Sequence, residues 1–92
     1  MTAREKSAIV NDLRLYDQME AEALSEIAGL QERGSTLCAR SLAAELAGDN
    51  ATADCYYSRG WKLLDEARKK RLRLADLRVT MRRTESEIAH AL

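Results

Sequence analysis

The fold is decided by the central stretch Leu46-Ala47-Gly48-Asp49-Asn50-Ala51. Glycine suits the left-handed position that follows a helix, and Asp or Asn caps the start of the next one. The chain has no Pro, so this stretch is its strongest turn signal. The sequence therefore predicts a single domain over 1–92, with one helix over about 3–47, a turn at 48–50 and a second helix over about 51–90.

Apolar and small residues recur at steps of three and four on both sides of this turn, which is typical of one helical face. In the first half they are Ile9, Leu13, Tyr16, Met19, Ala23, Ile27, Leu30, Leu37, Ser41 and Ala44. In the second half the stripe comprises Tyr56, Gly60, Leu63, Ala67, Lys70, Leu74, Leu77, Met81, Thr84, Ile88 and Ala91, of which Lys70 and Thr84 are polar exceptions. Two long helices joined by a short loop are antiparallel neighbours. We therefore expect an all-α antiparallel helical hairpin that resembles a coiled coil.

The charges of the two halves are opposite. Residues 1–48 hold five Lys/Arg and eight Asp/Glu, whereas residues 49–92 hold ten Lys/Arg and seven Asp/Glu. In a hairpin centred on the turn, positions whose numbers sum to about 97 lie level with each other. The acidic segment 17–32 then faces the basic segment 68–83, and we expect acids to meet bases along much of the hairpin. Glu20 and Lys70 fall inside the two apolar stripes, where polar residues can fix register.

Further apolar residues flank both stripes, and a lone hairpin leaves them in water. They are Val10, Leu15, Leu24, Leu42, Leu46, Tyr57, Trp61, Leu64, Leu72, Ala75 and Val79. Contiguous exposed apolar surface marks an interface. We therefore expect two hairpins to pair into a four-helix bundle, a homodimer. The alternative is a three-helix bundle in which the chain bends at Gly34, since an interior Gly costs a helix about 1 kcal/mol relative to Ala.

Composition limits the function classes. A single domain of 92 residues is too small for an enzyme with its own cleft, and no catalytic or cofactor motif is present. The two cysteines, Cys38 and Cys55, and the one histidine, His90, do not supply the four ligands of a zinc site. Both thiols are expected to be free. No run of 18 apolar residues and no apolar N-terminal stretch occurs, so we expect a cytoplasmic protein without a membrane span. Frequent Arg and Ala suggest a bacterial gene.

The candidate site residues are two aromatics and four bases: Tyr57, Trp61, Arg68, Lys69, Arg73 and Arg83. Trp and Tyr are enriched at binding hot spots, although packing at the end of the bundle is the expectation we favour here. Clustered Lys and Arg can contact nucleic acid, but residues 68–73 wrap around more than one helical turn. The sequence thus favours a non-enzymatic protein-interaction or adaptor module that self-associates and binds an unknown protein. The alternative is a small nucleic-acid-binding accessory protein.

Overall fold

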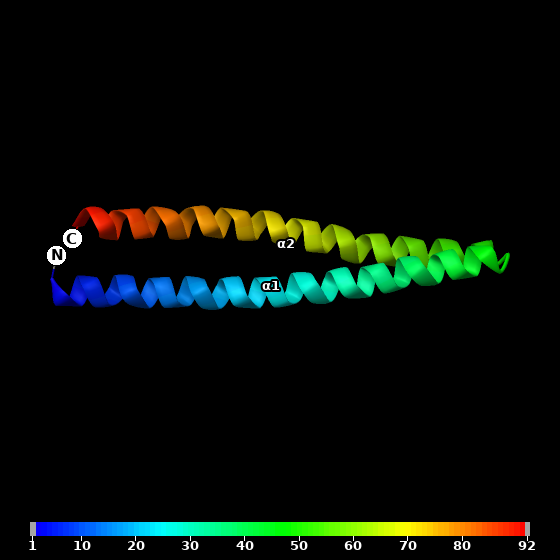
Figure 1. Ribbon diagram of the computed structural model, residues 1–92, viewed down its shortest axis with the longest axis horizontal. Helices are drawn as coiled ribbons and strands as arrows, with labels where there is room; N and C mark the ends of the chain where they lie inside the picture. The colour runs from blue at the N-terminus through cyan, green and yellow to red at the C-terminus, as the bar shows by residue number, and fades with distance from the viewer. Residues whose placement is uncertain (1, 92) are drawn as a thin grey trace.

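The computed structural model describes residues 2–91 as two long helices joined by a tight turn (Figure 1). Helix α1 runs Ala3–Leu46 and helix α2 runs Asn50–Ala91. The two helices lie side by side with the chain ends at one end of the molecule and the turn at the other (Figure 1). The molecule measures 69 × 15 × 12 Å. The predicted antiparallel helical hairpin is confirmed.

The turn is held by backbone hydrogen bonds and by one capping side chain. The N–H of Asp49 donates to the Ala44 carbonyl at 2.9 Å, and the N–H of Gly48 donates to the Glu45 carbonyl at 3.0 Å. This pair is the Schellman pattern, which requires the left-handed φ of +82° that Gly48 adopts. Asp49 then caps α2, because the Thr52 backbone N–H and hydroxyl donate to its two carboxylate oxygens at 3.1 and 2.6 Å. Both bonds hold the pKa of Asp49 below its ordinary 3.8, and the bond from the Thr52 hydroxyl has the larger effect.

One stripe on each helix is buried or half-buried, and the two stripes form the seam of the hairpin. On α1 the stripe comprises Ile9, Leu13, Tyr16, Glu20, Ala23, Ile27, Leu30, Gly34, Leu37, Ser41 and Ala44. On α2 it comprises Ala53, Tyr56, Gly60, Leu63, Ala67, Lys70, Leu74, Leu77, Met81, Thr84 and Ile88. The prediction for Met19 is wrong, since Met19 is exposed and Glu20 occupies that seam position. The side chain of Ala91 lies outside the described residues.

Three contacts fix the register of the seam. The Lys70 ammonium lies 2.6 Å from a Glu26 carboxylate oxygen, and the Arg78 guanidinium lies 3.7 Å from Glu20. Nearer the turn, the buried Ser41 hydroxyl donates to the Ala53 carbonyl of α2 at 2.7 Å. In each contact the two residue numbers sum to between 94 and 98, close to the expected value of about 97.

Helix α1 passes through Gly34 without interruption, so the three-helix alternative is wrong. The physical reason is close contact with α2. A Cβ atom on Gly34 would lie 2.8 Å from two side-chain carbons of Leu64 and 3.1 Å from the Gly60 carbonyl oxygen. A Cβ atom on Gly60 would lie 2.8 Å from the Cys38 sulfur. The two glycines therefore let the helix backbones approach, and the cost of a Gly within a helix is offset by this packing.

Candidate interaction surfaces

The hairpin has two long flanks, one on each side of the seam. On one flank Leu64 packs against Gly34 and Cys38 packs against Gly60. Helical periodicity places Leu42, Tyr57 and Trp61 on the same side, and we call this side the aromatic flank. The opposite flank carries an open groove between the helices near the turn half of the molecule. We call it the arginine groove, because Arg33, Arg40 and Arg59 line it.

The aromatic flank presents a pair of rings to solvent. Tyr57 and Trp61 are one turn apart on α2, and their ring centroids lie 6.0 Å apart in an edge-to-face arrangement. Their side chains are 54% and 51% exposed. Ser58, Lys62 and Asp65 complete a shallow hollow beside the rings. Within the hairpin both rings are exposed, whereas the neighbouring Tyr56 is half-buried in the seam. Packing of Tyr57 and Trp61 at the end of a bundle of hairpins stays a prediction.

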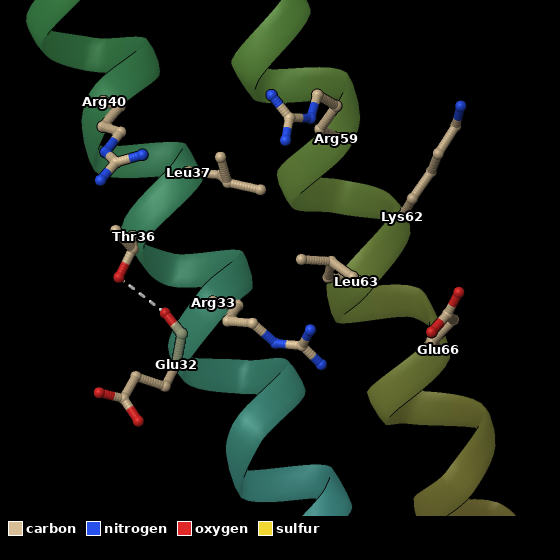
Figure 2. A pocket seen from close by; sticks show the side chains of 9 residues that line it. All are labelled: Glu32, Arg33, Thr36, Leu37, Arg40, Arg59, Lys62, Leu63 and Glu66. Carbon is tan, nitrogen blue, oxygen red and sulfur yellow. Dashed lines mark hydrogen bonds between the residues drawn. The ribbon is translucent and has the colours of Figure 1, made fainter.

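The arginine groove has a volume of about 650 Å³. Its floor is apolar, formed by Leu37 of α1 and Leu63 of α2. Its rims carry four bases, which are Arg33, Arg40, Arg59 and Lys62. Figure 2 shows the guanidinium groups of Arg33 and Arg59 directed into the space between the helices, whereas Lys62 extends away from it.

The four bases of this groove form no ion pair with any residue that the structure describes. The two carboxylates in its lining, Glu32 and Glu66, form no ion pair within 4.0 Å among residues 2–91, and Glu32 points away from the groove (Figure 2). Arg33 makes one local hydrogen bond, from its Nε to the Gly29 carbonyl at 3.4 Å. A guanidinium presents its donors as a planar fork that suits carboxylates and phosphates. The groove is therefore an apolar trough with rims able to bind anions.

The six candidate residues from the sequence do not form one site. Tyr57, Trp61 and Arg68 share the aromatic flank, because Arg68 follows Trp61 by one heptad. Lys69 and Arg83 follow Lys62, a residue of the groove lining, by one and three heptads and share its flank.

Arg73 lines a separate small hollow between the helices on the flank of the groove, with Met19, Glu26 and Leu77. The sequence-based prediction does not include the arginine groove, although Arg33 and Arg40 are one heptad apart and therefore share a helix face. The prediction names bases of the run 68–73 instead, where the bases are nearly consecutive.

Ion pairs account for only part of the basic segment. Arg68 and Lys69 both pair with Asp65 on their own helix, at 3.3 and 3.2 Å. Lys70 lowers the pKa of Glu26 below 4.5, mainly through its hydrogen bond and then through its charge. Lys69 lowers the pKa of Asp65 below its ordinary 3.8 in the same way. Arg78 pairs with Glu20 across the seam. The remaining four bases of the segment form no ion pair in the part of the chain that the structure describes: Arg71, Arg73, Arg82 and Arg83.

The expectation that acids meet bases across the hairpin is confirmed at two levels, but the pairs do not extend along much of its length. Cross-helix pairs occur only at Glu20 and Glu26 among the described residues. Cys38 and Cys55 are both free thiols, as expected.

No described helix is long and apolar enough to cross a membrane. Within residues 2–91 there is also no cluster of three or more side chains suited to a metal ion. Comparison with protein-family models, with curated proteins and with solved structures gave no match. The class of protein that the geometry defines is a helical hairpin with two chemically different flanks.

Proposed function

We propose that this chain is a non-enzymatic helical protein-interaction module that self-associates and acts as an adaptor. One observation carries the proposal, namely the large apolar side chains that the two-helix seam leaves between 44% and 80% exposed. They are Val10, Leu15, Met19, Leu24, Leu42, Leu46, Tyr57, Trp61, Leu72 and Val79. Exposed apolar side chains favour a binding role where they lie together on one side, as Leu42, Tyr57 and Trp61 do on the aromatic flank and Leu15 and Met19 do on the groove flank.

The free energy available from burying these side chains is large enough to support association. Full burial of a Leu-sized or larger side chain stabilises by about 1.5–3 kcal/mol, so each half-exposed side chain leaves part of that energy unused. Association costs roughly 4–15 kcal/mol before any surplus appears as affinity. Covering several such side chains at once can therefore exceed the cost, whereas covering one cannot. Each of the two long flanks is large enough for an interface that covers several side chains.

The two flanks suit two different partners, which is what an adaptor requires. Edge-to-face aromatic rings such as Tyr57 and Trp61 anchor interfaces well, because they bury a large area with few rotatable bonds. We assign this flank to a partner protein. We further propose a cytoplasmic location, for which the two free thiols are the supporting observation, since thiols persist in reducing compartments.

Sedimentation velocity of the full chain tests self-association. From about 1 to 100 µM protein, we expect the sedimenting mass to rise from the 10.3 kDa chain to twice that mass. A mass that stays at 10.3 kDa over the whole range contradicts the proposal. Circular dichroism at each concentration serves as the control that the hairpin itself stays folded.

A small nucleic-acid-binding accessory protein is the second candidate. It is favoured by four arginines of the basic segment that form no ion pair among the described residues: Arg71, Arg73, Arg82 and Arg83. Fluorescence anisotropy with labelled duplex and single strands, first at low and then at about 0.15 M salt, separates the candidates. Binding that disappears at the higher salt rejects nucleic-acid recognition. Retained affinity that falls when Arg71 and Arg73 are both changed to Ala, but not when Arg4 and Arg14 are, favours it over the adaptor.

A further inference from the structure

The groove flank of α1 carries acidic residues in its first half and basic residues in its second half. Heptad positions place Asp12, Glu22 and Glu26 toward the chain ends on this flank, and Arg33 and Arg40 toward the turn. A helix face that is acidic at one end and basic at the other is complementary to a second copy of itself laid antiparallel. The face therefore carries the charge pattern of a two-fold symmetric contact, in which the same surface serves both subunits.

The basic half of this flank forms no ion pair among residues 2–91, although Glu66 occupies the position that matches Arg33. Arg40 of α1 and Arg59 of α2 occupy matching positions on either side of the groove, so like charges oppose each other across the seam. Elsewhere on the seam, opposite charges meet, as at Glu26 and Lys70. Like-charge opposition costs stability, and an incoming carboxylate would relieve it. The occupant that the groove fits is therefore acidic.

The acidic half of the same flank supplies a matching occupant. Leu15 and Met19 project there one turn apart, and their side chains are 53% and 44% exposed. Asp12 and Glu22 lie on either side of this apolar pair along the helix. An apolar pair between carboxylates matches an apolar trough between bases, which is the pattern of a helix lying in a groove.

A glycine at the middle of α1 is explained by neither half of the hairpin. A Cβ atom added to Gly29 would meet no atom within 4 Å, unlike the crowded positions at Gly34 and Gly60. An interior Gly costs a helix roughly 0.5–1 kcal/mol relative to Ala, and the hairpin gains no packing in return. Gly29 lies on the groove flank between the acidic and the basic halves. Close approach of a second helix at this point accounts for it.

We propose that two copies pair through the groove flank, with the α1 helices antiparallel and crossing near Gly29. The Asp12–Glu26 half of each α1 then lies over the arginine groove of the other copy. Leu15 and Met19 of one copy cover the floor formed by Leu37 and Leu63 of the other. This arrangement rests on the proposed self-association and specifies its interface. It leaves the aromatic flank of both copies free for a partner protein.

Charge reversal with rescue tests the arrangement. The variant Arg33→Glu with Arg40→Glu has an acidic face at both ends, and Asp12→Arg with Glu22→Arg has a basic face at both ends. Each variant alone is expected to dimerise at least about 100-fold more weakly than the natural chain, because four cross-copy contacts become repulsive. An equimolar mixture of the two variants is expected to form a heterodimer at the natural affinity, as is a chain that carries all four changes. Circular dichroism verifies that each hairpin is folded.

The matched control is Arg4→Glu with Arg14→Glu, which makes the same change in net charge on exposed positions of α1 away from the groove flank. We expect it to dimerise like the natural chain. A second control, Tyr57→Ser with Trp61→Ser, alters only the aromatic flank and is also expected to leave the dimer intact. A natural chain that dimerises, but whose dimer is insensitive to the groove reversals, overturns this interface and leaves self-association standing. A natural chain that remains monomeric overturns both.

Discussion

Gly34 and Gly60 face each other across the seam so closely that neither position has room for a side chain. The Cβ atom that any other residue would carry at Gly60 lies 3.0 Å from the Gly34 carbonyl oxygen and 3.2 Å from the Cys38 backbone nitrogen. The reciprocal atom at Gly34 lies 3.1 Å from the Gly60 carbonyl oxygen. This crossing sets how far Leu64 and Cys38 project beside the seam, and it therefore shapes the aromatic flank.

Alanine at either glycine is expected to destabilise the hairpin. Overpacking of a tight contact costs about 1–3 kcal/mol, and the gain in helix propensity of up to about 1 kcal/mol offsets only part of it. Gly60→Ala should cost more than Gly34→Ala, because backbone atoms of α1 obstruct it on two sides, whereas Leu64 can move. Urea unfolding followed by circular dichroism measures both free energies.

Gly29→Ala is the matched control for these two variants. Its Cβ atom meets open space, so the free energy of unfolding should rise by about 0.5–1 kcal/mol through helix propensity alone. The measurement belongs at low protein concentration, where self-association does not contribute. A loss of stability at Gly29 equal to that at Gly60 would contradict the crossing as the cause.

Gly48→Ala is expected to lose about 1–2 kcal/mol of unfolding free energy, because a Cβ atom is unfavourable at a φ of +82°. Gly48→Asn should lose less, since Asn tolerates the left-handed region better than Ala does. Thermal or urea unfolding ranks the three chains. Equal stability of the Ala and Asn variants would show that the turn does not require this conformation.

The ion pair between Glu26 and Lys70 predicts a pH dependence. The hydrogen bond and charge of Lys70 lower the pKa of Glu26 in the folded chain below 4.5. The folded state then binds fewer protons than the unfolded state, so the pair stabilises the chain above this pH. That stabilisation is lost as the pH falls from about 4.5 through the lowered pKa.

Glu26→Gln removes this titrating group, and we expect its stability to fall less steeply below pH 4.5 than that of the natural chain. Carboxyl NMR provides the independent check. The pKa of Glu26 should move back toward 4.5 in Lys70→Met. An unchanged pKa in Lys70→Met would contradict Lys70 as its cause.

Ser41→Ala is expected to cost about 1 kcal/mol of unfolding free energy, the net value of a typical hydrogen bond. The buried Ser41 hydroxyl donates to the Ala53 carbonyl of the other helix and so ties the helices together near the turn. Ser35→Ala, on an exposed position of the same helix, is the control and should change stability little. Urea unfolding compares the two variants, and an equal loss in both would contradict a specific role for the Ser41 bond.

The seam could be predicted from the sequence because its signal is periodic and repeats over many heptads. Even Lys70 and Thr84, polar residues at stripe positions, lie where the spacing placed them. The same spacing distinguishes Glu20 from Met19, because a strict alternation of three- and four-residue steps leads from Tyr16 to Glu20 and then to Ala23. The prediction of Met19 is wrong because it follows the apolar side chain instead of the spacing, and in the seam Glu20 pairs with Arg78 of α2.

The surfaces were harder to predict because they depend on residues far apart in sequence. Arg33, Arg40 and Arg59 come together only after the chain folds back, and they do not form a run of bases in the sequence. Conversely, the basic run 68–73 is easily seen in the sequence, but the helix distributes its side chains around the axis. Two of its bases, Arg68 and Lys69, form ion pairs with Asp65. Tyr57 and Trp61 lie outside the stripe positions of α2 and are exposed, whereas Tyr56, at a stripe position, is half-buried.

Sedimentation velocity of the natural chain, titrated to about 100 µM at physiological salt, tests the central claim of self-association most directly. We predict a concentration-dependent shift to twice the mass of the 10.3 kDa chain, with the hairpin fully helical throughout. A single folded species of 10.3 kDa at the highest concentration would contradict it.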